Sequence, residues 1–485
     1  MVGSRLRRYW RNWQTLCQDP FVTSILKTGY RLQLSAIPPL TTSPREPRHS
    51  VAQIKVLQES VNKLVEKGAV RSISEVQLTP GFYSDIFLVP KKDSPELRMI
   101  HNLAVFNDRY LSPPPTFKML TLRDIIAVIR PGDWLASLDL KDAYLHVPMH
   151  ADFHHYLRFV LQGRHYEWKV LPFGISIAPW LFTRITTPMS RFLHRRGISF
   201  YPYLDDCLMR CHSKTGLTAH VAFIMDFLKQ LGWIINIEKS RLAPTQSLQF
   251  IGAWLRPDLG LVQVPLDRWE KIQTMIVIAL TAPMTFRGWQ SLLGLLTSAQ
   301  DLTLRGRLQL RRLQMFLNPF VRFNNPDLII SLPDDLRSSL QWWQLRSNVL
   351  EGVSMRAFIA THHLFVDASL EGWGAHLSNQ TTSGLWSPVE LGLHINLLEL
   401  LAVYYAILHW RQMLTEASLM VATDSTTAAA YINRMLMVGC GCGVGVENVT
   451  TMTALSRRID EVEGVSWCGT GSVITEQHSM FAVVE

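Results

Sequence analysis

The sequence has few cysteines, and it lacks several signals that mark other classes of protein. Its 485 residues include 6 cysteines at scattered positions without CxxC spacing, so neither a zinc site nor a disulfide framework is indicated. No run of about 18 apolar residues predicts a membrane span, and the N-terminus has no apolar core of a secretory signal. We therefore expect an intracellular protein of the cytoplasm or nucleus that is not secreted and does not enter a membrane.

A low content of charge also limits the classes of protein to consider. Only 18% of the residues are charged and 47% are hydrophobic, a balance typical of globular domains rather than disordered chains. A chain of this length is expected to fold as two or three domains. Its 48 Lys and Arg residues outnumber its 39 Asp and Glu residues, and the resulting net charge of +9 favours a polyanionic partner. No nucleophile elbow supports a hydrolase of the Ser/His/Asp type.

The first 50 residues are basic and then rich in proline. Arginines interleave with aromatic residues over residues 5–13, which fits equally a phosphate-binding arm or the solvated start of a helix. The proline-rich residues 37–50 predict an extended linker. Apolar residues at helical spacing, followed by a glycine, predict a helix over residues 51–68. We therefore expect the first domain to begin near Val51.

Strands and helices are mixed in the region that follows. Hydrophobic periodicity predicts strands at residues 134–140, 156–160, 164–170, 199–204 and 207–211, and helices at residues 179–194 and 217–231. This order favours an α+β domain over a doubly wound parallel sheet. Residues 266–354 have helical spacing with recurring Trp and Leu, and we expect this connector to bury Trp342 and Trp343 in its core.

A second α/β unit is predicted from about Ala357. Its expected strands cover residues 363–367, 373–378, 384–386 and 419–423, and its expected helices cover residues 395–414 and a segment from Thr426. After residue 434 the pattern changes, because the glycine-rich stretch GCGCGVGVENV and the residues beyond it have neither helical nor strand periodicity.

Three aspartates are predicted to converge in the first domain. Asp205 and Asp206 are adjacent in the hairpin sequence YPYLDDCLM, and Asp139 ends the apolar strand WLASLDL. Aspartates at a turn need no function beyond hydrogen bonds with the backbone groups of the turn. A sheet that pairs these elements, however, would bring the three carboxylates together. They would then raise one another's pKa unless a cation joined them. Mg²⁺, with Mn²⁺ as the alternative, takes such oxygen ligands together with phosphate oxygens.

Five motifs in this region occur in the order and spacing of a known family. They are SLDLKDAY, LPFGISIAPWLF, YLDD, LGWIINIEKSRLAPTQ and FIGAWL. In these motifs the chain resembles the reverse transcriptases, most closely those of LTR-type and DIRS-type retrotransposons. The resemblance covers about residues 51–255. It implies an α+β right-hand polymerase fold with fingers, palm and thumb, and a polymerase that copies RNA into DNA.

The resemblance also implies roles for individual residues. Asp139, Asp205 and Asp206 would be the catalytic metal ligands, and Tyr144 would exclude ribonucleotides unless it serves only as a core residue. The other implied residues bind the nucleotide (Lys91, Lys92, Arg98, Gly174 and Lys239) or form the primer grip (Phe250 and Gly252). Cations suit developing phosphate charge and glycine permits close backbone approach, although outside the family the lysines are only an exposed turn. Asn102 stands where the family commonly has an aspartate.

Three further acids lie in the second α/β unit. Asp367 ends a predicted strand, Glu399 lies on the long predicted helix, and Asp424 follows another strand. Taken singly, Glu399 suits a salt bridge and Asp424 suits a helix N-cap. Together they resemble the RNase H fold, which implies a site for two Mg²⁺ ions that cuts the RNA strand of an RNA–DNA hybrid. The later acid and histidine-bearing loop of that family have no match after Arg434, so we expect the RNase H domain to be incomplete and hypothesise a frame-shifted, mis-spliced or decayed end.

The sequence therefore predicts a chain of five segments. These are a basic N-terminal segment and linker (1–50), reverse transcriptase fingers and palm (51–255), a helical thumb or connection (256–355), an α/β RNase H-like domain (356–434) and an aberrant or disordered tail (435–485). The expected partners are an RNA template, a DNA primer, an RNA–DNA hybrid and dNTPs, bound mainly through phosphate and shape. The alternative is a catalytically inactive element remnant that still binds nucleic acid.

Overall fold

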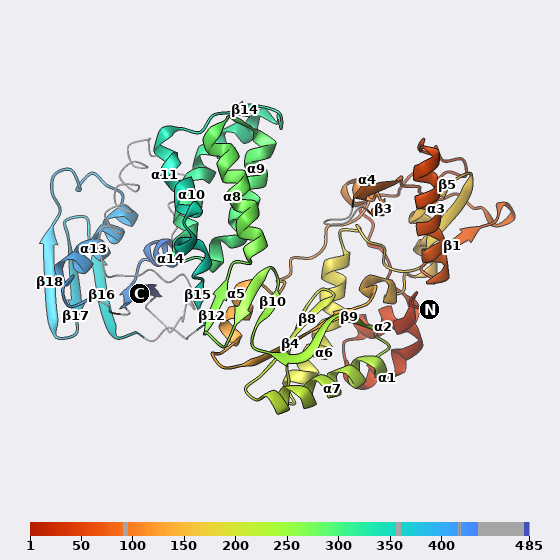
Figure 1. The fold of residues 1–485 in the computed structure, drawn as a ribbon, viewed down its shortest axis with the longest axis horizontal. Helices are drawn as coiled ribbons and strands as arrows, with labels where there is room; N and C mark the ends of the chain where they lie inside the picture. The colour runs from red at the N-terminus through yellow and green to blue at the C-terminus, as the bar shows by residue number, and fades with distance from the viewer. Residues whose placement is uncertain (91–95, 356–359, 416, 418, 435–479, 485) are drawn as a thin grey trace. The chain divides into compact units, whose positions relative to one another are not determined.

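The structure is a computed structural model that describes residues 1–90, 96–355, 360–415, 417, 419–434 and 480–484 (Figure 1). The chain divides into two compact units. The first comprises Met1–Thr121 and Asp133–Leu248, and the second comprises Leu122–Gly132 and Gln249–Glu485. Among the described residues, no helix combines the length and the apolar character needed to cross a membrane.

A four-stranded antiparallel sheet in the first unit carries the first group of acidic residues. Its strand order is β7 (Ser199–Tyr203), β8 (Asp206–Cys211), β4 (Trp134–Leu140) and β9 (Ile235–Thr245). The helices α6 (Ala178–His194) and α7 (Lys214–Gln230) pack against these strands. Phe182 on α6 and Leu228 on α7 are fully buried, because each helix turns an apolar stripe toward the sheet. The strands and helices predicted here are confirmed, with small shifts at their ends.

Two smaller antiparallel sheets and further helices complete the first unit. The sheets are β1 (Val70–Ile73) with β6 (Arg164–Trp168) and β5 (Arg158–Leu161), and the hairpin of β2 (Ile86–Pro90) and β3 (Leu97–His101). The helices are α3 (Val51–Glu66) and the short α4 (Ala104–Arg109). α3 starts with a capping box, in which the side chains of Ser50 and Gln53 bond each other's backbone N–H. This motif satisfies two free donors of the first turn and explains why the helix begins where the sequence predicts.

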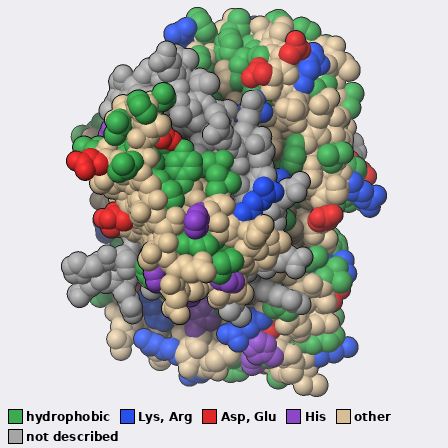
Figure 2. Space-filling view, turned by 90° about the vertical axis from the view of Figure 1, so that its left-hand side faces the viewer, with side chains coloured by type: hydrophobic (Ala, Val, Ile, Leu, Met, Phe, Trp, Pro, Cys, Tyr) green, Lys and Arg blue, Asp and Glu red, His purple; other side chains and the backbone are tan. Residues whose placement is uncertain are grey.

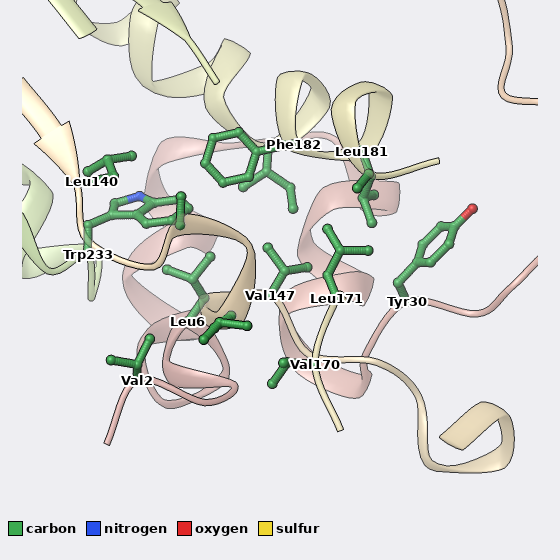
Figure 3. Packing of buried hydrophobic residues seen from close by; sticks show 14 of the residues in the cluster. Val2, Leu6, Tyr30, Leu140, Val147, Val170, Leu171, Leu181, Phe182 and Trp233 are labelled. Carbon is green, nitrogen blue, oxygen red and sulfur yellow. The ribbon is translucent and has the colours of Figure 1, made fainter. Parts of the chain in front are cut away.

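The N-terminal segment belongs to the core of the first unit, which differs from the expected arm and linker. Its elements are η1 (Arg5–Tyr9), α1 (Trp10–Leu16) and α2 (Pro20–Thr28). Figure 3 shows Val2 and Leu6 in one cluster with Phe182 and Trp233. Trp13 is fully buried, and its Nε1 donates to the carbonyl oxygen of Leu231 at 2.9 Å. Burial of each large apolar side chain stabilises the fold by about 1.5–3 kcal/mol, so the apolar residues between the arginines decide where the segment lies.

The second unit begins with a helical part. Its helices are α5 (Leu122–Val128), α8 (Leu266–Thr281), α9 (Phe286–Ala299), α10 (Gly306–Leu317), α11 (Asp334–Gln344) and α12 (Arg346–Leu350). Short strands accompany them: β10 (Leu248–Phe250), β11 (Ala253–Arg256), β12 (Leu261–Gln263) and β15 (Val353–Ser354) in one sheet, and β13 (Met284–Thr285) with β14 (Ile329–Ile330). Trp289 and Trp343 are fully buried, which confirms the core role predicted for Trp343.

A five-stranded sheet forms the remaining part of the second unit. Its order is β18 (Gln380–Leu385), β17 (Gly372–Leu377), β16 (His362–Ala368), β19 (Leu419–Thr423) and β20 (Met480–Val484). Of the adjacent strand pairs in this sheet, β16 and β19 run parallel and the other three run antiparallel. The helix α13 (Ile395–His409) packs on β16 and β17, and α14 (Thr426–Arg434) follows β19. β20 comes from the predicted tail, of which residues 435–479 and 485 lie outside the described residues.

Two elements of this sheet region differ from the predicted bounds. α13 ends at His409 because Trp410 takes the C-cap position, buried and donating through Nε1 to Gln380 Oε1 at 2.8 Å. β18 begins at Gln380, four residues before the predicted strand, because it pairs with β17 along its whole length. The first residues of β18 are polar, so the alternation of apolar and polar residues that predicts a strand is missing there. On the face in Figure 2, basic and acidic side chains are scattered among hydrophobic and uncharged ones.

Candidate active sites

The hairpin of β7 and β8 carries Asp205 and Asp206 at a two-residue turn. Tyr203 pairs with Asp206 across the ladder, so Leu204 and Asp205 are the turn residues. Leu204 has φ of 51°, in the left-handed region where two-residue hairpins commonly place glycine. A branched side chain there costs about 1–2 kcal/mol, and strain of this kind clusters at functional sites.

Asp139 lies directly across the sheet from this turn. In the ladder of β4 and β8 its Cα partner is Asp206, and the backbone N–H of Leu140 donates to the carbonyl oxygen of Asp205 at 2.8 Å. On the other side of β4, the N–H of Asp139 donates to Ser240 Oγ at 3.0 Å. The register therefore brings together the three aspartates that the sequence singles out.

The carboxylates of this site disfavour one another's charge. Partial burial, with added repulsion from Asp205 and Asp139, raises the pKa of Asp206 to about 6. Partial burial and Asp139 also raise the pKa of Asp205, while Lys239 opposes both shifts. Both aspartate side chains remain exposed to solvent. The site thus holds negative charge that a bound cation would stabilise.

Tyr144 lies in the short helix η3 (Ala143–His146), close to the aspartates. Its ring contacts Phe173 and Phe182, with ring centroids at 5.6 Å and 5.3 Å. Burial, with Asp205 as a further cause, raises the pKa of its phenol to about 12. The ring is half-buried. The ring therefore packs in the core near Asp205, and its role toward the nucleotide sugar stays a prediction.

Gly174 takes φ of 89° in the loop before α6, a conformation that other residues rarely adopt. The side chain of Asn107 on α4 fixes this loop. Its Nδ2 donates to the carbonyl oxygen of Gly174 at 2.8 Å, and its Oδ1 accepts from the N–H of Ser176 at 3.0 Å. Neither Asn107 nor Ser240 was predicted from the sequence. A lone asparagine or serine without a motif gives no signal of a long-range contact.

The predicted nucleotide-binding cations are only partly described. Lys91 and Lys92 lie outside the described residues. Arg98 is exposed on β3, opposite Val89 of β2. Asn102, which replaces the family's aspartate, accepts a hydrogen bond from the N–H of Ala104 at 3.2 Å and so supports the start of α4. This position has a local structural role at the start of α4.

Lys239 and the predicted primer grip lie in different units. Lys239 is exposed on β9 of the first unit. In the second unit, Phe250 ends β10 and is buried, and Gly252 lies in the turn before β11 with φ of 70°. The roles of these residues toward the nucleotide and the primer stay predictions.

A second acidic cluster lies at one edge of the five-stranded sheet. Asp367 is near the end of β16, Asp424 directly follows β19, and Glu399 is on α13. Because β16 and β19 are parallel, their carboxyl ends lie at the same edge. One oxygen from each of the three side chains lies within 4.8 Å of the others, and within the described parts of the chain no other group of three metal-ligand side chains is so compact.

The electrostatics of this cluster centre on Glu399, which is 6% exposed. Burial, with repulsion from Asp424 and Asp367, raises its pKa from 4.5 to about 7. The hydroxyl of Thr423 donates to Glu399 Oε2 at 3.4 Å and partly offsets the shift. Oxygen ligands at this spacing fit a hard divalent cation, which would relieve the repulsion.

Comparison with known proteins finds a family match for each of the two parts of the chain that carry an acidic cluster. Residues 89–255 match the family described as reverse transcriptase (RNA-dependent DNA polymerase), and residues 358–436 match the RNase H-like domain found in reverse transcriptase. Protein P of duck hepatitis B virus (strain United States/DHBV-16) is 29% identical over 203 residues, which are 39% of this chain and 23% of that protein. The Gag-Pol polyprotein of walleye dermal sarcoma virus is 26% identical over 212 residues, 43% of this chain and 12% of the polyprotein. This chain thus spans under a quarter of the length of these two relatives.

A solved structure gives the same fold over most of the chain. The foamy viral protease-reverse transcriptase in complex with RNA/DNA hybrid has a TM-score of 0.56 and 16% identity, and the match covers 91% of this chain and 57% of that one. The fold class predicted from the sequence, a right-hand polymerase followed by a helical connector and an RNase H-like domain, is confirmed.

Proposed function

We propose that this chain, which belongs to the reverse transcriptase family and carries an RNase H-like domain, is an RNA-directed DNA polymerase that copies retroelement RNA into DNA. The observation that carries the proposal is the sheet register that sets Asp139 opposite Asp206, beside Asp205 at the hairpin turn. In the reaction, the 3′-hydroxyl of a DNA primer displaces pyrophosphate from the α-phosphate of a dNTP.

Divalent metal ions are the cofactors that reverse transcriptases and RNase H-like domains generally use, and we propose Mg²⁺, with Mn²⁺ as the alternative. Asp139, Asp205 and Asp206 would hold the ions in the palm. The raised pKa values of Asp205 and Asp206 and their all-oxygen donors fit this role. When bound, such ions lower the pKa of an attacking hydroxyl and stabilise the charge of the leaving group.

The residues around the aspartates would bind and select the nucleotide. Tyr144, held by Phe173 and Phe182, would stand under the sugar and leave no room for a 2′-hydroxyl. Gly174, locked by Asn107, would let the backbone approach the template and nucleotide. Lys91, Lys92 and Arg98 would pair with the triphosphate, and Lys239 would donate a proton to the departing pyrophosphate.

We propose that the second cluster cleaves the RNA strand of an RNA–DNA hybrid. Asp367, Glu399 and Asp424 would hold divalent ions there, which their compact spacing and the raised pKa of Glu399 support. The proposed partners are therefore an RNA template, a DNA primer and their hybrid. The foamy viral relative was solved with such a hybrid, which supports this choice. We place the activity inside the cell, where thiols such as the free Cys17 and Cys207 stay reduced.

The test is extension of a DNA primer on an RNA template with Mg²⁺ and dNTPs. We expect extension by the wild type, and its loss in Asp205→Asn. Asp226→Asn is a matched control, because Asp226 is an exposed aspartate on α7 that pairs only weakly with Lys229, at 3.8 Å. Equal product from the wild type and Asp205→Asn would reject the catalytic proposal and favour an inactive element remnant.

A further inference from the structure

The positive charge of the chain is concentrated in two segments that pack together. Residues 5–28, which form η1, α1 and α2, and residues 178–196, which form α6 and the turn after it, contain 9 of the 48 Lys and Arg residues but 1 of the 39 Asp and Glu residues. These segments thus carry a net charge of +8, whereas the rest of the chain, with 39 cations and 38 acids, is close to neutral. α1 packs against both α2 and α6 within the first unit (Figure 1), so this charge lies in one region.

The exposed cations of the two segments form a surface that we call the basic face. Its members are Arg7, Arg8, Arg11, Lys27, Arg184, Arg191 and Arg195. The ring of Trp10 holds two of them, because Lys27 Nζ lies 5.0 Å and the guanidinium of Arg11 lies 5.9 Å from the ring centroid. Arg7 Nε donates to the carbonyl oxygen of Lys27 at 3.0 Å. These contacts join the cations of η1, α1 and α2.

The basic face continues onto α6. Arg184, Arg191 and Arg195 are seven and four residues apart, so they recur on one exposed side of that helix. Burial raises the pKa of Cys17, the residue that caps α1, and the charges of Arg191 and Arg184 oppose this shift. Because the charges that shift a pKa are nearby ones, these two arginines lie beside the end of α1.

The basic face has little acid to balance it. In the part of the chain that the structure describes, one carboxylate pairs with its members, that of Asp19 with Arg184 at 2.5 Å. Like charges that are held together repel one another, and their summed field attracts a polyanion. The charge distribution therefore favours a ligand with several negative charges in a row.

Strand β4 shows that the basic face lies away from the palm aspartates. Leu138 and Leu140 belong to the same buried cluster as Phe182 of α6, so they point toward the helices. Side chains alternate along a strand, and Asp139 therefore points to the opposite face of the sheet. The exposed arginines of α6 lie on the side of the helix that is turned away from the sheet. The helix layer thus separates the basic face from the carboxylate of Asp139.

The apolar residues of these helices distinguish between two polyanionic partners. A helix that binds an anionic membrane surface inserts an exposed apolar face beside its cations. Residues 5–28 and 178–196 have no exposed large hydrophobic side chain, and Trp13 of α1 and Leu26 of α2 are fully buried. A nucleic acid needs no such insertion, because its phosphates supply the affinity. The cations lie on four separate elements, which a flexible single strand can follow.

We propose that the basic face binds a single-stranded nucleic acid through its phosphates, at a site separate from the palm aspartates. Contacts to phosphate carry no base information, so oligo(U) RNA and oligo(dT) DNA of equal length should bind alike. The inference does not depend on the polymerase proposal, since a chain without catalytic activity could bind a strand in the same way.

The test measures binding of fluorescein-labelled oligo(U) to the full chain by fluorescence anisotropy over a range of salt concentrations. Arg8→Gln/Arg11→Gln should weaken binding about 10-fold and make the slope of log K against log salt shallower by about 1.4, which is about 0.7 for each cation removed. Arg191→Gln/Arg195→Gln on α6 should have the same effects, because one strand would contact both regions. Melting temperatures should stay unchanged, since these four side chains are exposed.

The matched control removes two cations from a balanced helix. Lys55→Gln/Lys63→Gln changes two exposed lysines of α3, which also has Glu59 and Glu66, and it should bind oligo(U) like the wild type. Primer extension at saturating template–primer should be unchanged in both arginine variants. The polymerase proposal is tested separately by Asp205→Asn, which should still bind oligo(U) at the basic face.

Three results would overturn the inference whatever primer extension shows. In the first, both arginine variants bind oligo(U) with the affinity and salt slope of the lysine control. In the second, one arginine pair has no effect, so the face is not continuous. In the third, polyglutamate or vesicles containing phosphatidylserine displace labelled oligo(U) as effectively as unlabelled oligo(dT) does, which would make the face a general anion site or a membrane site.

Discussion

In the palm, two of the three acids lie side by side at one hairpin turn, whereas in the RNase H-like domain each acid comes from a different element. Asp205 and Asp206 are exposed and Asp139 is half-buried, and only in the second cluster do three carboxylate oxygens lie within 4.8 Å of one another in the described residues. The palm depends on a strained turn to present its charges. The second site depends on the convergence of two parallel strands and a helix.

This difference indicates where each site obtains its remaining ligands. The palm carboxylates, of which those of Asp205 and Asp206 are exposed, are less compact than the second cluster and leave room for the triphosphate of a nucleotide, whose oxygens would complete the metal shell. The compact cluster around Glu399 can hold a cation with protein oxygens and water. We therefore expect the palm to assemble with its substrate, and the second site to be formed in advance.

The largest effects should separate the two sites. Asp206→Asn should lower primer extension at least about 1,000-fold and leave cleavage of a labelled RNA–DNA hybrid within about 2-fold, because each site has its own metal ligands. Glu399→Gln should have the opposite effects. Gel assays of primer extension and of hybrid cleavage, run on the same preparation of each variant, measure these effects. If either variant lost both activities while remaining folded, the independence of the two sites would be wrong.

The next effect concerns stability and pH at Glu399. Its pKa is raised from 4.5 in the unfolded chain to about 7 in the folded one. Below pH 4.5 both states bind the proton, so stability is fully present there, and it is lost as pH rises through about 7. The loss at high pH should be about 3 kcal/mol. Thermal unfolding in EDTA should therefore show a melting temperature that falls over this range.

Mg²⁺ and the substitution Glu399→Gln should each remove this loss of stability at high pH. Because the cation relieves the repulsion, Mg²⁺ should raise the melting temperature more at pH 8 than at pH 5. Glu399→Gln should be more stable than the wild type in EDTA at pH 8 and should respond little to Mg²⁺. Glu371→Gln, a change at an exposed acid of the same domain, is the control and should behave like the wild type. A Mg²⁺ effect independent of pH would contradict this account.

Much of this arrangement could be predicted from the sequence. The strand β4 and the two aspartates after β7 have strong local patterns, apolar alternation and a polar turn, which depend on few neighbours. What could not be predicted depends on distant contacts. The pattern around Trp13 predicted a basic arm or the solvated start of a helix, although its partner Leu231 lies 218 residues away. The clamp of Asn107 on Gly174 and the position of Arg268 over Gly252 likewise leave no periodic trace.

A moderate effect should follow from removing the ring of Tyr144. Tyr144→Ala should lower the preference for dNTPs over ribonucleotides by about 10-fold to 200-fold, because we propose that the ring held by Phe173 and Phe182 would occupy the space of a 2′-hydroxyl. Tyr144→Phe keeps the ring and should keep the preference. Single-nucleotide incorporation with dATP and ATP measures the ratio. If the alanine variant retained the preference, Tyr144 would be only a packing residue.

The smallest effect tests the strain at the palm turn. Leu204→Gly should relieve the left-handed leucine, a gain of about 1–2 kcal/mol that the greater chain entropy of glycine reduces to about 0.5–1 kcal/mol. Primer extension should nevertheless fall several-fold, because a freer turn holds Asp205 less firmly. Gln162→Gly is the matched control, since Gln162 has φ of 52° in the two-residue turn of β5 and β6. It should gain similar stability in urea unfolding at unchanged activity. If Leu204→Gly were equally active, the strain would have no role in presenting the aspartates, and the contrast between the two sites would rest on burial alone.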